Sequence, residues 1–258
     1  MVYSAWGEGY RPGGLNRFCS VGNEADYGGQ GRDDATGAQC DFVPDFLTSF
    51  EVGVKTTLMD GRMILNAAAF MQDWDDFQFS RLDTSISPVT LTYNIGQAKS
   101  DGVEADFTAM IAENWSLSGA FSYIEAELSQ DYYQSDGQDA PTASSGTTLP
   151  RVPKTKWNLS TRYELESNWF VQASYIFTGS SYNNLYDGGT IPTKRYKQKD
   201  YQILNVAVGM DMDTWRAEMY VRNLTDERGE VFRNAVNWDD RIMTNRPRTL
   251  GVSMSLKF

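Results

Sequence analysis

The fold is decided by residues 249–258, which read Thr-Leu-Gly-Val-Ser-Met-Ser-Leu-Lys-Phe. Apolar residues occupy every second position up to an aromatic last residue, and small or polar residues fill the positions between. Side chains of a β-strand point alternately to its two faces, so this segment has one apolar and one polar face. Such a strand is suited to stand between hydrocarbon and a wet interior.

The same alternation recurs along the chain and predicts about ten strands. Short polar turns alternate with long polar loops between them, and Asp60-Gly61 is a strong hairpin signal. Short turns at one end and long loops at the other are typical of outer-membrane barrels. We therefore predict an all-β, antiparallel, up-and-down meander that forms a segment of a transmembrane β-barrel. The expected strands are residues 2–8, 46–58, 63–79, 89–111, 115–128, 151–165, 169–178, 201–210, 215–224 and 247–258.

Composition limits the function classes. The mean hydropathy is -0.48, and no stretch approaches the ~20 apolar residues that a spanning helix needs. The formal net charge of -11 argues against nucleic-acid binding. The chain has no histidine, which excludes His-dependent catalytic triads and removes the commonest metal ligand. We expect no enzyme, no cofactor and no bound metal.

Two acidic motifs are candidate sites. Asp73-Trp74-Asp75-Asp76 lacks the glycine and regular spacing of a calcium loop, so we interpret it as a rim of charged strand residues. Glu125 and Glu127 share one strand face, but nothing indicates a closed pocket that would raise the pKa of either carboxyl as glycosidase chemistry requires.

Three predicted strands begin with tryptophan directly after a short turn, at Trp115, Trp169 and Trp215. In a barrel these side chains would lie at one height and form a membrane-interface belt. Tryptophan is also simply a good strand residue, which is the alternative.

Cys19 and Cys40 are the two cysteines of the chain and lie in a long Gly- and Asp-rich loop. We predict a disulfide between them, which would indicate an oxidising compartment; two free thiols remain the alternative. Met1 leads directly into a strand without a signal peptide, so we expect a piece of a longer exported protein.

Several segments, taken in order, resemble the C-terminal half of a TonB-dependent outer-membrane receptor. They are residues 9–17 (Gly-Tyr-Arg-Pro-Gly-Gly-Leu-Asn-Arg), 50–56 (Phe-Glu-Val-Gly-Val-Lys-Thr), 94–98 (Asn-Ile-Gly-Gln-Ala), 152–154 (Val-Pro-Lys), 222–226 (Arg-Asn-Leu-Thr-Asp) and 246–251 (Arg-Pro-Arg-Thr-Leu-Gly).

This resemblance implies a barrel of about twenty-two strands in the bacterial cell outer membrane, filled by an N-terminal plug domain. Residues 1–258 would be its C-terminal barrel segment, with the plug absent. The implied partners are outer-membrane lipid, the barrel-assembly machinery, a ferric chelate of the siderophore type and, in the intact parent, the plug and an inner-membrane energy-coupling complex. The end of the chain also resembles the signal that the assembly machinery reads, formed by Met254, Leu256 and Phe258.

Arginine and aromatic residues of the long loops are the candidates for ligand contact, because such side chains suit planar iron chelates. They are Arg11, Arg17, Tyr132, Tyr133, Tyr182, Tyr186 and Trp238.

Two other function classes compete with a receptor segment. A self-contained ten-stranded barrel could act as a passive pore, but it would be narrow and filled by side chains. The small inward residues, such as Ser116, Ser118 and Ser160, favour a wide lumen instead. A soluble β-sandwich for adhesion would stay in the aqueous phase during detergent partition.

Overall fold

A computed structural model describes residues 1–16, 32–33, 38–39, 41–82, 90–133, 139–186, 194–234 and 241–256. These residues form strands, turns and loops, and no helix in this part of the chain is long and apolar enough to cross a membrane.

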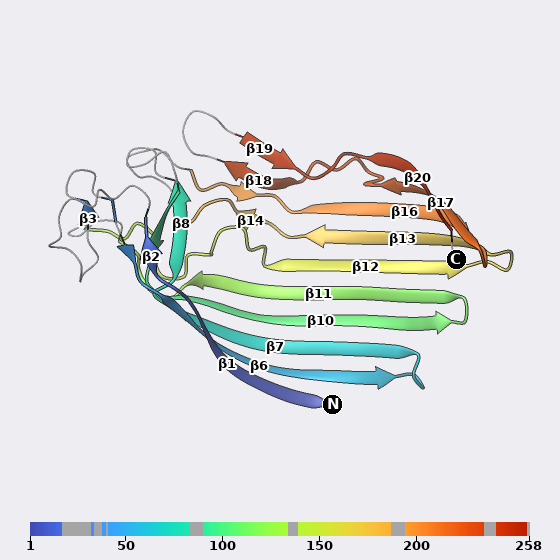
Figure 1. Ribbon diagram of the computed structural model, residues 1–258, viewed down its shortest axis with the longest axis horizontal. Helices are drawn as coiled ribbons and strands as arrows, with labels where there is room; N and C mark the ends of the chain where they lie inside the picture. The colour runs from blue at the N-terminus through green and yellow to red at the C-terminus, as the bar shows by residue number, and fades with distance from the viewer. Residues whose placement is uncertain are drawn as a thin grey trace.

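Ten long strands form a single antiparallel sheet in which every strand pairs with its neighbours in chain order (Figure 1). This confirms the predicted up-and-down meander. The strands are β1 (Val2–Arg11), β6 (Asp45–Leu58), β7 (Met63–Asp75), β10 (Ala98–Ala112), β11 (Trp115–Leu128), β12 (Thr155–Glu164), β13 (Trp169–Thr178), β16 (Tyr201–Asp211), β17 (Trp215–Arg222) and β20 (Thr249–Leu256).

Short two-stranded pieces gather at the loop end of this sheet, on the left in Figure 1, while the tight turns lie at the other end. The turn between β6 and β7 has positive φ at Asp60 and Gly61, as the Asp-Gly signal predicts. The short strands are β2 (Gly14–Leu15), β3 (Arg32–Asp33), β4 (Ala38–Gln39), β5 (Asp41–Phe42), β8 (Gln78–Leu82), β9 (Thr90–Asn94), β14 (Ser181–Tyr182), β15 (Lys197–Gln198), β18 (Glu230–Asn234) and β19 (Arg241–Thr244).

The third and fourth predicted strands are each broken in two. Asp76 and Gly96 have φ values of 53° and 88°, which take the chain out of the extended conformation. Beyond them β8 and β9 form a separate hairpin, and the Phe77 amide donates to the Gly96 carbonyl oxygen at 2.7 Å across the break.

The buried apolar core lies among the loops and not beneath the sheet. Its members come from strand β9 and the residue after it, from the loop-side ends of β10 and β11, and from the segments that follow β11 and β13. They are Leu91, Tyr93, Ile95, Ala98, Ala126, Leu128, Tyr132, Ala143, Leu149, Leu185 and Tyr186. The large apolar side chains of the sheet itself remain mostly exposed, including Phe50, Val171 and Leu250. A sheet of this kind needs lipid or further protein against its apolar face.

Candidate functional site

Pairing between strands assigns each side chain to one of two faces of the sheet. Lys156 pairs with Ser122 and Thr178, so these polar side chains share one face. The next residue, Trp157, pairs with Phe121 and Phe177 on the other face. We call the first face the inner face and the second the outer face.

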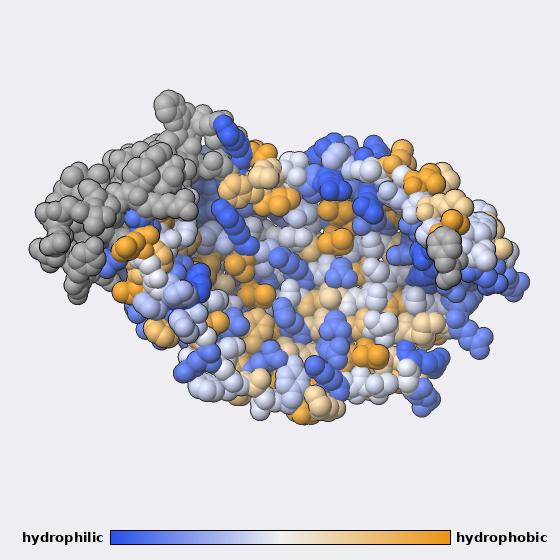
Figure 2. Space-filling model, viewed as in Figure 1, coloured by the Kyte–Doolittle hydropathy of each residue, from blue (hydrophilic) through white to orange (hydrophobic). Residues whose placement is uncertain are grey.

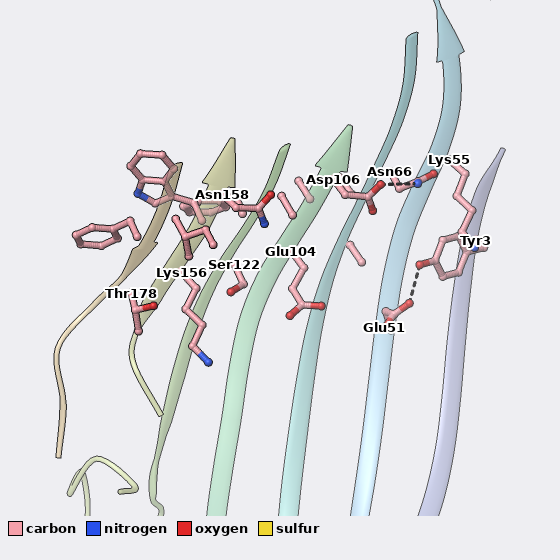
Figure 3. Close-up of a pocket in the computed structure, with 18 residues that line it drawn as sticks. Tyr3, Glu51, Lys55, Asn66, Glu104, Asp106, Ser122, Lys156, Asn158 and Thr178 are labelled. Atoms are coloured by element: carbon pink, nitrogen blue, oxygen red, sulfur yellow. Dashed lines mark hydrogen bonds between the residues drawn. The ribbon is translucent and has the colours of Figure 1, made fainter. Parts of the chain in front are cut away.

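The inner face carries a groove of about 610 Å³ that crosses the strands from β1 to β13 (Figure 3). Small side chains such as Ala68, Ala120 and Ser122 line its middle, which leaves room for a partner or solute. The polar side chains that line it are Tyr3, Glu51, Lys55, Asn66, Glu104, Asp106, Ser122, Lys156, Asn158 and Thr178. Charged side chains lie among apolar ones across the strands in Figure 2 as well.

Two hydrogen bonds order the acidic side of the groove. The Tyr3 hydroxyl donates to Glu51 Oε1 at 2.6 Å, and Asn66 Nδ2 donates to Asp106 Oδ2 at 3.0 Å (Figure 3). Glu104 and Lys156 have no ion-pair partner within the described residues. The groove can therefore form polar contacts with whatever occupies the space inside the sheet.

A second charged cluster lies on the inner face close to the short turns. The buried ring of Phe170 is enclosed by the Arg162 and Arg216 guanidiniums, at 3.7 and 4.7 Å from its centroid. Asp211 lies 3.6 Å from Arg162 and 3.8 Å from Arg216. Glu218 accepts from Arg216 at 3.0 Å, so the cluster is an ion-pair network built around an aromatic ring.

The outer face has an apolar band with a charged row above it. On β11 the band runs from Trp115 to Tyr123, which is about 27 Å along the strand at ~3.4 Å per residue. For a strand tilted by about 40° this corresponds to roughly 21 Å along the membrane normal, close to the ~25 Å band of outer-membrane barrels. Above it, Lys99 pairs with Glu127 at 3.2 Å and Lys154 with Glu125 at 2.6 Å.

Trp115, Trp169 and Trp215 all lie on the outer face next to a short turn, and their register is staggered. When the strand pairing is followed from Trp115 on β11 across β12 to β13, the residue reached is Val171. Val171 lies two residues after Trp169. When the pairing is followed from Trp169 on β13 across β16 to β17, the residue reached is Ala217. Ala217 lies two residues after Trp215. A shift of two residues along the strand, at about 3.4 Å per residue, across two strand spacings of about 4.8 Å corresponds to strands tilted by roughly 35° from the barrel axis.

Two of the predicted ligand contacts lie in the loop core. Tyr132 and Tyr186 are 8% and 7% exposed, and their ring centroids are 6.3 Å apart. Both rings are therefore buried and pack within the loop core in this structure. Tyr133 is 47% exposed, and Tyr182 is partly exposed beneath the Arg195 guanidinium, 3.6 Å from its centroid.

Arg11 is also used within the fold. Its guanidinium forms a bidentate pair with the buried carboxylate of Asp45 and donates to the Gln78 carbonyl oxygen at 3.1 Å. The Gln78 amide donates to the same carboxylate at 3.1 Å, so the pair joins β1, β6 and β8. These bonds give Arg11 a structural role at the end of β1.

The remaining predicted residues divide into two sets. Met254 and Leu256 lie on the outer side of β20 and are 67% and 60% exposed. The others lie outside the described residues; they are Arg17, Cys19, Cys40, Trp238 and Phe258.

The acidic motifs form no metal centre in the part of the chain that the structure describes. Asp73 lies opposite Lys99 on the outer face, and Asp75 accepts from Gln97 Nε2 at 2.8 Å. Glu125 binds Lys154 and Tyr123 on the exposed surface. In these contacts the acidic side chains have basic or polar partners.

Comparison with known proteins decides the family. The profile of the family described as "TonB dependent receptor-like, beta-barrel" matches residues 1–224. The chain belongs to this family. It is therefore part of a bacterial outer-membrane β-barrel, and the ten-stranded sheet is a portion of that barrel.

Two curated relatives and one solved structure illustrate the similarity. The probable TonB-dependent siderophore receptor PiuA of Acinetobacter baumannii is 25% identical over 188 residues, which cover 72% of this chain and 24% of PiuA. The catecholate siderophore receptor Fiu of Escherichia coli is 22% identical over 262 residues, covering 100% of this chain and 30% of Fiu. The crystal structure of the ferric yersiniabactin uptake receptor FyuA of Yersinia pestis superposes with a TM-score of 0.72 at 20% identity, covering 100% of this chain and 35% of FyuA. The chain thus spans 24% to 35% of the length of these proteins.

Sequence reasoning missed the network around Phe170 and the groove residue Tyr3. The alternation of residues shows on which face of the sheet a side chain lies, but it does not show which residue lies next to it on the neighbouring strand. Neither cluster could therefore be found before the register of the strands was known. One sequence signal does point to the network, namely the recurrence of Arg and Glu at alternate positions of the last strands.

Proposed function

We propose that this chain is the barrel wall of a receptor that takes up a ferric chelate of the siderophore type across the outer membrane. The observation that carries this proposal is the open ten-stranded sheet with one apolar face and one face of mixed charge. Relatives named as siderophore receptors support the cargo class.

The geometry favours a segment of a larger barrel over a self-contained pore. The sheet order begins with β1 and ends with β20, and these two edge strands do not pair with each other. An unpaired edge within a bilayer leaves backbone N–H and C=O groups without partners, which costs several kcal/mol for each group. We infer that further strands complete a barrel of about twenty-two.

Within that barrel the groove and the charged side chains of the inner face would contact a plug domain. Residues 1–258 would then be one barrel segment that does not include the plug. An inner-membrane energy-coupling complex would drive the plug rearrangement that lets the chelate pass. Capture of the chelate would fall to the long loops, where Tyr133 and Tyr182 remain the accessible candidates.

The outer face supports two further parts of the proposal. The tryptophan belt, formed by Trp115, Trp169 and Trp215, would mark one membrane interface. Met254, Leu256 and the terminal Phe258 would be read by the barrel-assembly machinery.

Uptake of radiolabelled ferric chelates tests the function. The longest reading frame that contains this chain is deleted in an iron-limited strain and then restored. We expect uptake to disappear and return, and to stop when the inner-membrane coupling complex is removed. Uptake that continues without the coupling complex would indicate a passive pore, and uptake that is unaffected by the deletion would contradict a receptor.

A further inference from the structure

Large aromatic side chains on the inner face of the sheet lie flat over glycines of the next strand. Strand pairing sets each of these rings directly opposite a glycine, and a Cβ atom at that glycine would overlap the ring. At Gly102 it would lie 2.6 Å from Phe70 Cζ, and at Gly53 it would lie 2.5 Å from Tyr3 Cζ. We call these contacts the glycine–ring pairs; they are Tyr3–Gly53, Phe70–Gly102, Phe170–Gly209 and Tyr220–Gly251.

The neighbouring strand covers these rings and keeps them out of the space inside the sheet. Tyr3 is half-buried, whereas Trp6, which points to the outer face from the same edge strand, is 66% exposed. The other inner-face aromatic residues of the ten-stranded sheet, Trp74 and Tyr201, lie where β7 and β16 meet the loops. Among the described residues, no aromatic ring therefore stands up from the middle of the inner face.

The outer face is built differently. Most of its aromatic residues pair with other large side chains, as Trp157 does with Phe121 and Phe177. In the part of the chain that the structure describes, Phe107 is the one outer-face aromatic residue of the sheet that lies over a glycine, Gly119. Flattened rings are thus a property of the inner face and not of the sheet as a whole.

A flat wall changes how a partner can move along it. Closely packed protein surfaces interdigitate, so a ring inserted into a hollow of the partner must be withdrawn before either surface shifts. Rings laid over glycine remove such projections, and small side chains such as Ala68, Ala120 and Ser122 line the groove between them. The contacts left to a partner are mostly polar, and water can replace polar contacts as the surfaces move.

We propose that the glycine–ring pairs keep the barrel wall smooth, so that the plug domain can shift along it during uptake. This inference rests on the proposed function and adds the part that the wall has in it. The glycines are positioning residues, because they act by holding the rings down and not by contact with the cargo. Their replacement should slow the movement of the plug and leave capture of the cargo unchanged.

The test uses the full-length receptor that contains this chain, compared at equal amounts of folded protein in the outer membrane. Gly102→Ala would raise the Phe70 ring from the wall. We expect the maximal uptake rate of a ferric chelate to fall about threefold or more, while the affinity for the chelate stays within about twofold. Maleimide labelling of a Ser122→Cys reporter in the groove follows the same step, because plug movement exposes the wall. This labelling should slow in parallel.

Two further variants separate flatness from folding. Gly119→Ala is the matched control: its Cβ would lie 2.8 Å from Phe107 Cε1 and 2.9 Å from a carbonyl oxygen, as that of Gly102 would lie 2.8 Å from one, but it faces the lipid. It should leave the uptake rate unchanged. Adding Phe70→Ala to Gly102→Ala removes the raised ring and should restore the rate, which a defect in folding would not do.

Equal slowing by Gly119→Ala, no slowing by Gly102→Ala, or no recovery when the Phe70 ring is removed would overturn the inference. So would slower uptake with unchanged labelling at position 122, because the ring would then obstruct the cargo and not the plug. The proposed function fails separately, if the wild-type receptor takes up no ferric chelate. In that case the labelling that depends on the coupling complex decides the inference by itself.

Discussion

The ring of Phe170 fills the space that a side chain would take at Gly209 on the neighbouring strand. A Cβ atom at position 209 would lie 2.7 Å from Phe170 Cζ and 2.4 Å from the Ala217 carbonyl oxygen. The backbone of Gly209 is not in the left-handed region, so space and not conformation requires the glycine. The Arg162 and Arg216 guanidiniums lie 3.7 and 4.7 Å from the centroid of this buried ring, so the space into which the ring could shift is limited.

Gly209→Ala should therefore destabilise the barrel. The new methyl group would meet a backbone carbonyl and an enclosed ring, and overpacking of this kind costs about 1–3 kcal/mol of unfolding free energy. Urea unfolding of the receptor in lipid vesicles measures the change. Gly9→Ala is the matched control, because nothing lies within 4 Å of a Cβ at that position. Equal effects of the two substitutions would show that the contact with Phe170 is unimportant.

Asn223→Ala should weaken the connection between β17 and β20. The Asn223 side chain donates to the carbonyl oxygens of Glu227 and Arg246, each at 2.9 Å, and accepts from the Glu227 amide at 2.9 Å. The residue is 3% exposed and has a φ of 54°, so alanine would lose these bonds and adopt a strained backbone. We expect a loss of about 2–4 kcal/mol in the same unfolding assay.

The control for this change is Asn168→Ala in a short turn. Asn168 has a similar φ of 62°, but its side chain makes only a contact with Met212 Sδ among the described residues. Alanine there should cost about 1–2 kcal/mol, the backbone part alone. If both variants lose the same amount, the side-chain bonds of Asn223 contribute nothing.

Acid should loosen the segment that precedes β20. The Arg248 amide donates to Asp226 Oδ1 at 2.8 Å, and this bond is the main reason that the pKa of Asp226 lies below its ordinary value of 3.8. Arg228 and Arg248 add favourable charge. A carboxyl whose pKa is lowered on folding contributes stability above its unfolded pKa and loses it as the pH falls through the folded value.

Hydrogen exchange of the Arg248 amide, corrected for the intrinsic rate, measures this effect. Protection should be constant near neutral pH and decrease below the ordinary pKa of Asp226. Asp226→Asn keeps the shape and an acceptor oxygen but not the charge, so its protection should be lower and independent of pH. Protection that does not vary with pH in the wild-type protein would contradict the role of this carboxylate.

The sheet could be predicted almost completely from the sequence, because alternation of side chains is the physical condition for a strand with lipid on one side. The boundaries of β11 and β13 agree with the predicted strands at residues 115–128 and 169–178. Prediction failed where the chain leaves the sheet at Asp76 and Gly96, since nothing in the alternation indicates a left-handed residue.

The loop sites were less predictable for a related reason. Whether an aromatic ring is buried depends on contacts between loops far apart in the sequence. Tyr132 and Tyr186, for example, pack on each other, and Arg11 is paired with Asp45 across 34 positions. The sequence therefore indicates that the loops contain aromatic and arginine residues, but not which of them are accessible.

The staggered register leads to a prediction about Trp115, Trp169 and Trp215. If the strands tilt by about 35°, a stagger of two residues over two strands brings all three side chains to one height in the bilayer. Three variants of the receptor, each with one of these residues as its single tryptophan and phenylalanine at the other tryptophan positions, are reconstituted with lipids brominated at different depths. We expect quenching to report one common depth near the interface. Leu159→Trp in the same tryptophan-free background is the control, because Leu159 pairs with Gly119 in the middle of the band and should be quenched closer to the bilayer centre. Three different depths for the belt positions would show that the strands are not tilted as the register implies.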